Sequence, residues 1–551
     1  MRNKTLTQSA EDFRSKVLKD TSADKFDLIV IGGGITGAGI LREAARRGLK
    51  VLLLEQKDFA WGTSSRSSKM VHGGLRYLGE GQIRLTRESV RERQRYLTEL
   101  PGLVNVMRYL MVHKPKQFPP RWIFQILLGV YDFFAGKKYR QSVDAQELPS
   151  WLGPIHPGNA TGGSVFADAV TDDSRLVLRT LSEAVGDGGV AVNYAEVSEL
   201  LKDDDDTVTG VQIRDLVKDA QYSVMADTVV NATGAWAAKL GGADSPEVRP
   251  LRGSHLVVPF WRLPVSCSIS MIHPKDDRPV FVFPWQGAAV IGTTDLDHKP
   301  SLNDEASISQ EEVDYLLEGA NYYLSDSKIS ESDVISTWAG VRPVISSGKG
   351  LDPSREKREH SIWQQPGLIT VSGGKLTTFR VIALDVLSRL PKAAALRRTK
   401  DFGQPFFRST LYVMNQIGRL SGRVKRRLSG RYGFEALDLI DAMHSNDKAE
   451  YSIGHSDTSW LELEWAIKHE SVVHLDDLLF RRTRIGNVMP DLTKGQWRKI
   501  QELFEEHQGW SEQKWCSELS RYQDIWRTCY AVPSLHGVKN NSAQSDLKEA
   551  V

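Results

Sequence analysis

Apolar runs alternate with amphipathic segments along the first 390 residues of the chain. Residues 26–31, FDLIVI, form a mostly apolar run that glycines end, which is typical of a buried parallel strand. Residues 35–48, ITGAGILREAARRG, carry small and apolar residues at helical spacing, and the final glycine can cap the helix. Residues 50–55, KVLLLE, predict a second buried strand. The fold therefore begins with a strand–helix–strand unit.

Further strands and helices follow in mixed order, which indicates an α/β or α+β protein and not a repeat array. The aspartates at 203–206 predict a solvated hairpin turn. Near residue 390 the chain becomes charged and helical, so we place a boundary at 390–405 and expect a mainly helical C-terminal domain. The strand candidates are 189–200, 207–215, 226–234, 279–295 and 367–374.

Composition limits the class of protein. At 551 residues the chain is long enough for several domains of about 150 residues each. A net charge of +2 argues against a nucleic-acid-binding protein. Three scattered cysteines, Cys267, Cys516 and Cys529, cannot form a disulfide scaffold or a zinc site, which fits a reducing compartment. We expect neither a secretory signal nor a membrane span, because no uncharged apolar run approaches ~18 residues.

A glycine motif lies between the first strand and the first helix. Gly32-x-Gly34-x-x-Gly37 allows a tight turn at Gly32, close approach of a pyrophosphate at Gly34 and helix–strand packing at Gly37. The helix N-terminus would add unpaired N–H groups and partial positive charge. Glu55 ends the second strand and can accept hydrogen bonds from both hydroxyls of an adenosine ribose. Together these features predict a dinucleotide site.

Two later segments favour FAD over NAD. Residues 226–236, ADTVVNATGAW, predict a buried strand that returns the chain to the cofactor edge of the sheet. Residues 372–380, SGGKLTTFR, place Gly-Gly-Lys between a strand and the start of a helix. NAD-binding domains need neither segment, whereas glutathione-reductase-like FAD domains usually have both.

In the stretch MVHGGLRYLGEG, residues 70–81, two glycines without side chains precede an arginine and a tyrosine, Arg76 and Tyr77. A glycine costs about 1 kcal/mol relative to alanine inside a helix and gains little inside a strand. Paired glycines at this position therefore indicate that the backbone passes close to something flat or bulky.

Several segments together resemble the FAD-dependent glycerol-3-phosphate dehydrogenase family, whose members oxidise sn-glycerol 3-phosphate and pass electrons to quinone. The resemblance runs from about Phe26 into the C-terminal domain, where AIKHESVVHLDDLLFRRTRIG resembles the helical cap of that family. It implies a glutathione-reductase-like FAD-binding domain, a D-amino-acid-oxidase-type substrate domain and an added C-terminal domain. The other matching segments are DLIVIGGGITGAGI, TSSRSSKMVHGGLRYL, VVNATGAW, RGSHLVVP, VFVFPWQGAAVIGTTD, WAGVRP and SGGKLTTFR.

The resemblance and the order of elements together give the expected boundaries. These are a polar lead (1–25), an FAD-dependent oxidoreductase region (26–395) with FAD-binding parts at about 26–80, 160–245 and 335–390 and substrate or cap parts at about 81–160 and 246–334, a helical C-terminal domain (400–540) and a polar tail (541–551).

The resemblance also implies how the chain holds the flavin. Gly73 and Gly74 would let the main chain lie against the isoalloxazine ring. Lys375 and the helix start at Leu376 would place positive charge near flavin N1, which favours the reduced anion, and Thr377 could reach the neighbouring carbonyl. The expected FAD contacts are Gly32, Gly34, Ile35, Thr36, Gly37, Glu55, Thr63, Ser64, Ser65, Ser68, His72, Gly73, Gly74, Val197, Ala232, Thr233, Gly234, Gly374, Lys375, Leu376 and Thr377.

The implied reaction is hydride transfer from C2 of glycerol 3-phosphate to flavin N5 with loss of the hydroxyl proton, giving dihydroxyacetone phosphate. Arg76, Arg342 and Arg358 are the expected phosphate ligands, because a planar guanidinium donates two parallel hydrogen bonds. Arg355 lies three residues from Arg358 and is an alternative to it. Tyr77 could hold a substrate hydroxyl.

His255 is the candidate base, since a neutral imidazole with a pKa near ~6.5 can accept a proton at physiological pH. The alternative is that His255 only donates a hydrogen bond, and His72 is expected to contact the flavin. His255, Arg342 and Lys375 are thus the expected catalytic residues, and no metal is expected.

Electron transfer to quinone implies an enzyme that is cytoplasmic and peripherally associated with the inner face of the cell membrane. We also expect a homodimer and no nucleic-acid partner. Residues 121–138, RWIFQILLGVYDFFAGKK, predict an apolar helix of roughly 20 Å, too short to cross ~30 Å of hydrocarbon. It is either a core helix or, given its basic ends and aromatic residues, a helix in the membrane interface. The basic run 423–431 could contact nucleic acid or anionic lipid, but an exposed helix face is the favoured interpretation.

Other functions remain open at this point. The nearest is an oxidase of the same family that passes electrons to O₂, although no extra insertion of the kind that family oxidases tend to carry precedes the C-terminal domain. An amine or amino-acid oxidase would share the scaffold, but it needs a carboxylate clamp and an apolar side-chain pocket. A flavin-binding protein without turnover is disfavoured by the presence of His255, Arg342 and Lys375.

Overall fold

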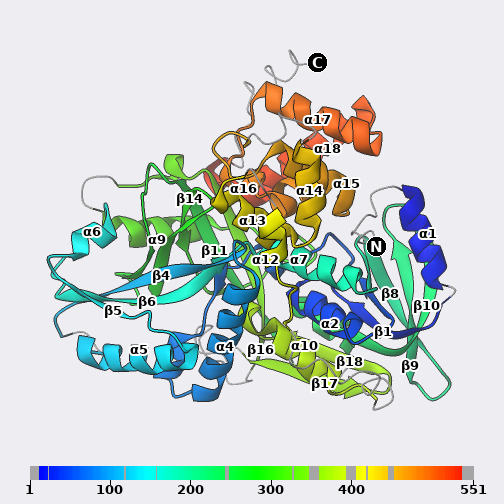
Figure 1. Ribbon diagram of the computed structural model, residues 1–551, viewed down its shortest axis with the longest axis horizontal. Helices are drawn as coiled ribbons and strands as arrows, with labels where there is room; N and C mark the ends of the chain where they lie inside the picture. Colours follow the sequence, from blue (N-terminus) through cyan, green and yellow to red (C-terminus); the bar gives the residue numbers. More distant parts are fainter. Residues whose placement is uncertain are drawn as a thin grey trace.

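Two large β-sheets lie side by side, and a helical C-terminal domain covers them from one side (Figure 1). The computed structural model describes residues 11–22, 24–116, 119–156, 158–241, 247–324, 328–346, 359–391, 405–416, 420–444 and 452–535. Within these ranges, no helix combines the length and apolar character that crossing a bilayer requires.

The first sheet is built on the strand–helix–strand unit that the sequence predicts. β1 (Phe26–Ile31) pairs in parallel with β2 (Val51–Leu54), and α2 (Ile35–Ala45) connects them. The strand order is β17-β18-β10-β1-β2-β7, and β8 and β9 extend β10 as an antiparallel meander. The predicted turn at 203–206 joins β8 to β9. The remaining strands are β7 (Val190–Val192), β8 (Ala195–Lys202), β9 (Val208–Asp215), β10 (Ala220–Asn231), β17 (His360–Gln365) and β18 (Leu368–Gly373).

The second sheet has the order β15-β11-β14-β13-β12-β4-β6-β3, with β16 on β11 and β5 on β6. β6 and β16 lie in ranges expected for the FAD-binding part, yet both pair in this sheet. The reason for β16 is its long antiparallel pairing with β11, from Ser336 to Ile345. The strands are β3 (Met70–Val71), β4 (Val104–His113), β5 (Gln141–Asp144), β6 (Gly162–Thr171), β11 (Val248–Pro259), β12 (Ser268–Ile272), β13 (Pro279–Trp285), β14 (Ala288–Gly292), β15 (Leu296–Asp297) and β16 (Ser336–Ile345).

Helices cover the outer faces of both sheets. In the first domain α2 packs between α7 (Asp173–Gly186) and α10 (Phe379–Leu387), and their apolar faces share one core. The short helix α8 (Ala237–Gly241) follows β10. The helices near the second sheet are α3 (Leu75–Gly79), α4 (Ile83–Glu99), α5 (Arg121–Ala135), α6 (Leu148–Leu152) and α9 (Gln310–Asn321).

The polar N-terminal lead contains a helix, α1 (Glu11–Ser22), that docks on the first sheet. Leu18 is fully buried there. Arg14 forms an ion pair with Asp215 across 2.9 Å and donates a hydrogen bond to the Tyr194 carbonyl. Two buried side chains therefore fix a segment that the sequence indicated only as a polar lead.

The C-terminal domain is helical, as predicted, and packs its apolar side on the second sheet. Trp338 of β16 and Phe283 of β13 share one core with Leu463 and Phe480. Its elements are α12 (Leu411–Gln416), α13 (Gly422–Tyr432), α14 (Glu435–His444), α15 (Trp460–His469), a π-helical turn (Asp477–Arg482), α16 (Ile485–Val488), α17 (Lys494–Gln508), α18 (Glu512–Ile525) and a second π-helical turn (Trp526–Tyr530).

The basic run on α13 is only partly exposed, which corrects the expected solvated helix face. Arg423 extends into solvent beside Asp457. Arg431, in contrast, is 4% exposed and forms an ion pair with Asp172 at the start of α7. The helix turns one side toward the FAD-binding domain, so its last turn is buried between domains.

Candidate functional site

One cavity of about 1310 Å³ runs between the two sheets. Its lining begins at the glycine motif after β1, passes the segment that follows β2, and ends at α5 and the aromatic residues of the second sheet. Strand ends from the first sheet and side chains from the second sheet therefore face the same space. This position outside the carboxyl ends of parallel strands is where nucleotides bind in such sheets.

The nucleotide end of the cavity has the geometry that a pyrophosphate requires. Gly32 has φ of +113°, and a Cβ on Gly37 would lie 1.9 Å from the Gly32 carbonyl oxygen, so both positions need glycine. Gly34 is the N-cap of α2 and supplies no side-chain cap, and Gly34, Ile35 and Thr36 line the cavity. The helix N-terminus thus presents backbone N–H groups to the cavity, which suits a phosphate anion.

Glu55 follows β2 directly and lines the same end of the cavity. Its two carboxylate oxygens accept hydrogen bonds from the Gly33 N–H at 2.6 Å and the Lys57 N–H at 2.8 Å. Burial raises the pKa of Glu55, and these two backbone hydrogen bonds oppose that rise. A carboxylate oxygen can accept more than one hydrogen bond, so the acid can still receive ribose hydroxyls.

Two tryptophans that sequence reasoning missed form the next section of the wall. Trp61 and Trp236 lie with ring centroids 6.1 Å apart, and both line the cavity. The Trp236 indole N–H is buried and has no hydrogen-bond partner among the residues that the structure describes. The position of Trp236 at the end of the VVNATGAW motif was the available signal.

The glycine pair at 73–74 is required by packing within the protein. A Cβ on Gly73 would lie 2.3 Å from the Tyr131 hydroxyl and 2.4 Å from a Val90 methyl, and Gly73 does not line the cavity. Gly74 has φ of +76° and does line the cavity. The predicted close approach of backbone to a bulky group is therefore met at Gly73 by a tyrosine side chain of α5.

Asp168 holds this glycine segment and was also missed. Its Oδ1 accepts hydrogen bonds from the Gly73 N–H at 3.0 Å, the Tyr131 hydroxyl at 2.6 Å and Arg93 at 2.6 Å. His72 lines the cavity beside this group, and burial lowers the pKa of His72 to about 4. The imidazole of His72 is therefore neutral at physiological pH.

His255 lies behind the cavity wall and does not line it. It is 1% exposed, and its ring stacks on Trp338 with centroids 4.9 Å apart. Its Nε2 is 2.9 Å from the Ser68 hydroxyl, and Ser68 does line the cavity. Burial lowers the pKa of His255 well below its usual value, and the positive charges of Arg342 and Lys69 act in the same direction.

Three cationic side chains, those of Arg342, Lys375 and Arg76, line the cavity wall. Arg342 donates hydrogen bonds to Asp295 at 3.0 Å and to the Thr293 hydroxyl at 3.3 Å. Lys375 lies 4.0 Å from the ring centroid of Tyr77, and burial lowers the pKa of Lys375 to about 8. Arg76, beside Tyr77, is half exposed and pairs with a neighbouring glutamate. All four of these predicted residues line the cavity.

Most of the predicted set lies on the cavity. Four predicted residues do not: Gly37, Ser65, Gly73 and His255. Arg358 and its alternative Arg355 lie outside the described residues. The predicted residues that line the cavity are Gly32, Gly34, Ile35, Thr36, Glu55, Thr63, Ser64, Ser68, His72, Gly74, Arg76, Tyr77, Val197, Ala232, Thr233, Gly234, Arg342, Gly374, Lys375, Leu376 and Thr377.

Known proteins resemble the chain over nearly its full length. The family described as FAD dependent oxidoreductase matches residues 27–383, and the C-terminal domain of alpha-glycerophosphate oxidase matches residues 395–515. Aerobic glycerol-3-phosphate dehydrogenases of Staphylococcus saprophyticus and Staphylococcus aureus are 31% and 32% identical to it over 502 residues, 85% of this chain and 88% of theirs.

Solved structures of related proteins also resemble the chain. The glycerol-3-phosphate dehydrogenase from Bacillus halodurans complexed with FAD superposes with a TM-score of 0.72 at 27% identity, covering 94% of this chain and 98% of that one. The L-alpha-glycerophosphate oxidase from Mycoplasma pneumoniae with FAD bound shares the fold at 19% identity and a TM-score of 0.55, covering 70% of this chain and 99% of that one. The chain therefore belongs to the FAD-dependent oxidoreductase family, in the branch that contains the aerobic glycerol-3-phosphate dehydrogenases.

Proposed function

We propose that the protein oxidises sn-glycerol 3-phosphate to dihydroxyacetone phosphate and passes the electrons to a membrane quinone. The observations that carry the proposal are the cationic side chains of Arg342, Lys375 and Arg76 on the cavity wall and the hydrogen bond between Ser68 and His255. Bound FAD supplies the acceptor for the hydride of the substrate C2. The relatives named glycerol-3-phosphate dehydrogenase support the substrate.

Arg342 and Lys375 are the proposed ligands of the phosphate, with Arg76 nearer the solvent. The guanidinium of Arg342 is oriented by Asp295 and Thr293, which leaves its charge close to the cavity. A fixed guanidinium and an ammonium ion favour a phosphate dianion over an uncharged polyol. Glycerol should therefore be a far weaker substrate than its phosphate.

The hydroxyl proton of the substrate is proposed to leave through Ser68 to His255. Ser68 lines the cavity, and its hydroxyl is hydrogen-bonded to Nε2 of His255. Burial keeps the imidazole of His255 neutral, and a neutral imidazole has a ring nitrogen with a lone pair that can accept the proton from Ser68 when the C2–H bond breaks. Proton and hydride thus leave in different directions, and the ketone remains.

Anaerobic titration of the purified flavoprotein tests the substrate. Glycerol 3-phosphate should bleach the flavin absorbance, whereas glycerol at the same concentration should leave it unchanged. Bleaching by both compounds, or by neither, would contradict the proposed phosphate clamp.

The apolar end of the cavity supports a quinone as the electron acceptor. This end lies between α5 and the second sheet, and aromatic residues of that sheet line it, among them Phe166, Phe281 and Phe283. Tyr109 also lines it, and its buried hydroxyl has no hydrogen-bond partner in the described part of the chain. That hydroxyl is enclosed, so a quinone carbonyl would accept a hydrogen bond from it once the wall opened around the phenol.

Tyr109→Phe tests this acceptor site. We expect a higher KM for a short-chain quinone, with flavin reduction by glycerol 3-phosphate unchanged. Slower flavin reduction with an unchanged quinone KM would place Tyr109 with the substrate and contradict its proposed role.

The outer face of α5 is the proposed membrane contact. Its inner face is buried through Phe124, Leu128 and Tyr131, so the core-helix interpretation is correct for that side. Its outer face exposes Trp122 and Phe133, which are 66% and 81% exposed, together with Ile126 and Val130.

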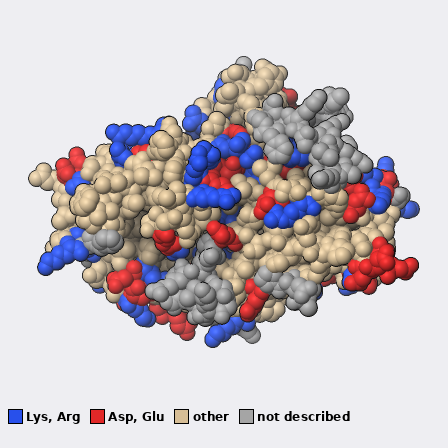
Figure 2. All heavy atoms as spheres, turned by 90° about the horizontal axis from the view of Figure 1, so that it is seen from below, with Lys and Arg blue, Asp and Glu red and all other residues tan. Residues whose placement is uncertain are grey.

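Charge on and around α5 agrees with a lipid surface. Exposed Lys116 precedes the helix, and exposed Lys137 and Lys138 follow it. Figure 2, the view from below Figure 1, shows uncharged surface interrupted by separate groups of basic and acidic residues. An apolar helix face between basic residues suits the interface of a bilayer that contains anionic lipid.

Cosedimentation with vesicles tests this face. Wild-type protein should bind vesicles that contain anionic phospholipid, and Trp122→Gln/Phe133→Gln should abolish binding while leaving flavin reduction intact. Trp261→Gln is the matched control, because Trp261 is 72% exposed on a different element. Equal loss of binding in both variants would contradict the assignment to α5.

An oxidase that uses O₂ is the second candidate. Its support is the match of residues 395–515 to the C-terminal domain of alpha-glycerophosphate oxidase. Substrate-reduced enzyme exposed to air separates the two functions: slow reoxidation without peroxide, but rapid reoxidation by a quinone, supports the dehydrogenase, whereas rapid formation of peroxide supports the oxidase.

A further inference from the structure

Three arginines of the C-terminal domain reach into the FAD-binding domain. Arg481 and Arg482 end the π-helical turn, and Arg484 follows two residues later. All three are at most 2% exposed. Residues 55–69 connect β2 to β3, and we call them the cradle segment. Each of the three arginines contacts this segment or a side chain that is bonded to it.

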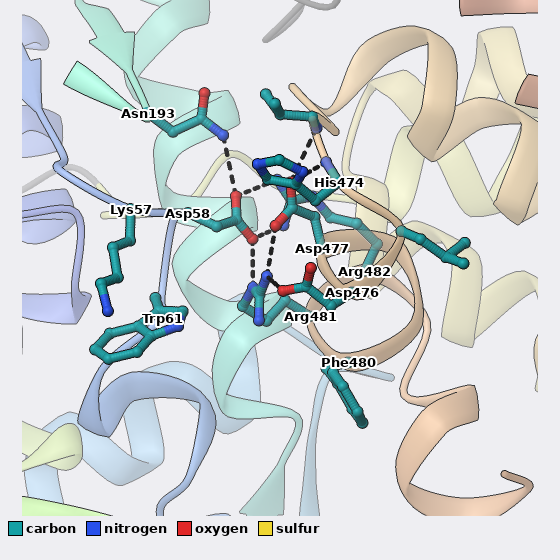
Figure 3. Close-up of polar contacts among 12 residues, drawn as sticks. Lys57, Asp58, Trp61, Asn193, His474, Asp476, Asp477, Phe480, Arg481 and Arg482 are labelled. Carbon is teal, nitrogen blue, oxygen red and sulfur yellow. Dashed lines mark hydrogen bonds and ion pairs between the residues drawn. The ribbon is translucent and has the colours of Figure 1, made fainter. Parts of the chain in front are cut away.

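Asp58 is the first contact point in the cradle segment. It is fully buried, and Arg482 donates two hydrogen bonds to its carboxylate, at 2.6 and 2.8 Å. Arg481 donates a third through Nε, and Asn193 a fourth at 3.0 Å. Figure 3 shows this carboxylate enclosed by the arginines and the asparagine, while Lys57 and Trp61 point away from the cluster.

The arginines keep Asp58 charged. Burial alone would raise the pKa of this carboxyl group, but the charges of Arg482 and Arg481 outweigh burial and hold the pKa below its usual range. Arg481 is in turn bonded to Asp476 and Asp477 of its own domain. The ion cluster therefore belongs to the C-terminal domain on one side and to the cradle segment on the other.

Arg484 holds the opposite end of the cradle segment. It donates a hydrogen bond to the Ser65 carbonyl at 3.0 Å and pairs with Asp173. The same Asp173 carboxylate accepts hydrogen bonds from the Ser67 N–H and from Lys69, both at 2.9 Å. Close by, the Tyr530 hydroxyl lies 3.3 Å from Nε of Arg66.

Some residues held by the C-terminal domain lie behind the cavity wall, beside residues that line it, whereas Arg66, which contacts Tyr530, lines the cavity itself. Asp58 and Ser65 do not line it, whereas Glu55, Trp61 and Ser64, on either side of them in the sequence, do. Ser64 also accepts a hydrogen bond from the Ile35 N–H at the start of α2, at 3.0 Å. Contacts on the back of the cradle segment therefore fix the position of its cavity-facing side chains.

We propose that Arg481, Arg482 and Arg484 are positioning residues for FAD, so that the C-terminal domain forms part of the cofactor-binding apparatus. None of the three lines the cavity. Their contribution is to fix the cradle segment before the cofactor arrives, which removes an ordering cost from binding.

The test uses the full-length holoenzyme and measures FAD retention by the fluorescence of released flavin after dilution. Asp58→Asn should weaken FAD binding by about tenfold or more, because both arginines lose a charged partner at the cradle segment. Arg521→Gln is the matched control. Arg521 binds Asp476 in the same cluster, and among the described residues its ion pair leads to Asp476 and not to the cradle segment. It should lower the melting temperature without increasing FAD release.

Two further variants separate positioning from general destabilisation. In Asp58→Asn/Arg482→Gln two amides replace the ion pair, so its loss of FAD affinity should be smaller than the sum of the two single losses. Tyr530→Phe keeps the ring stack on Phe480, with centroids 3.9 Å apart, but loses the hydroxyl beside Arg66, and should release FAD measurably faster. Unchanged FAD release in Asp58→Asn and Tyr530→Phe, or equal release in Arg521→Gln, would overturn the proposal.

Discussion

The Ser68 hydroxyl lies 2.9 Å from Nε2 of His255 and separates that imidazole from the cavity. His255 is stacked on Trp338, whose indole N–H donates to the Ser67 carbonyl at 3.2 Å. The ring therefore has a fixed orientation relative to the cradle segment. If His255 removes the substrate proton, it does so through Ser68.

His255→Gln should slow flavin reduction by glycerol 3-phosphate about 10²–10⁴-fold, because glutamine keeps a hydrogen bond to Ser68 but cannot accept a proton. Stopped-flow reduction of the flavin measures the effect, and FAD content should be unchanged. Ser68→Ala should slow the same step, since it breaks the route to the imidazole.

The chain offers a matched control for this prediction. His113 is also buried and bonded to a serine, with Nε2 2.8 Å from the Ser164 hydroxyl, but it does not line the cavity. His113→Gln should leave the reduction rate near that of the wild type. A normal rate in His255→Gln would exclude His255 as the base.

Arg342→Ala should lower kcat/KM for glycerol 3-phosphate by the equivalent of about 2–5 kcal/mol, mainly through KM, because the phosphate loses a positioned charge. The substitution also leaves Asp295 without this partner. Arg342→Ala/Asp295→Asn should recover stability but not KM. Arg262→Ala is the control: Arg262 pairs with Asp333 and does not line the cavity, so its kinetics should be normal.

Local patterns were sufficient to predict the nucleotide end of the site. Strand β1, helix α2 and Glu55 lie close together in the sequence, and Gly32 and Gly37 have local geometric reasons, namely the positive φ of Gly32 and the contact of Gly37 with the Gly32 carbonyl. The return of β10 was also predictable, because a buried strand ending in Ala-Thr-Gly is itself a signal. The hairpin at residues 203–206 is another short-range feature.

Features that depend on distant pairing could not be predicted in this way. β16 pairs with β11 although the two strands are far apart in the sequence. Gly73 is required by Tyr131 and Val90, and the glycine pair alone could not name them. The burial of the His255 side chain depends on Trp338 and Ser68, which come from other segments. The arginines of the C-terminal domain acquire a role only when Asp58 is placed beside them.

The lowered pKa of Lys375, about 8, predicts an alkaline limb in the rate of flavin reduction. Burial is the main cause of this shift, and the ammonium ion is charged below pH 8 and neutral above it. The rate should therefore fall as pH rises through about 8. Lys375→Met should react more slowly and lose this limb. Lys375→Arg should move it to higher pH, because a guanidinium stays charged; an unchanged limb in both variants would exclude Lys375 as its source.

Glu435 predicts a dependence of stability on pH that is separate from catalysis. It is 7% exposed on α14, and the Ser182 hydroxyl of α7 donates to it at 2.7 Å. Burial raises the pKa of Glu435 from 4.5 to about 7. Between pH 4.5 and 7 the folded state therefore binds more protons than the unfolded state, so the contribution of Glu435 to stability falls as pH rises through this window.

Glu435→Gln removes this titration and keeps a neutral side chain of the same shape. Relative to the wild type, the variant should be more stable at pH 8, by at most about 3 kcal/mol, and nearly unchanged at pH 5. Melting temperatures at the two pH values measure the difference. An equal shift of the Glu435→Gln melting temperature at both pH values would mean that Glu435 ionises normally in the folded protein.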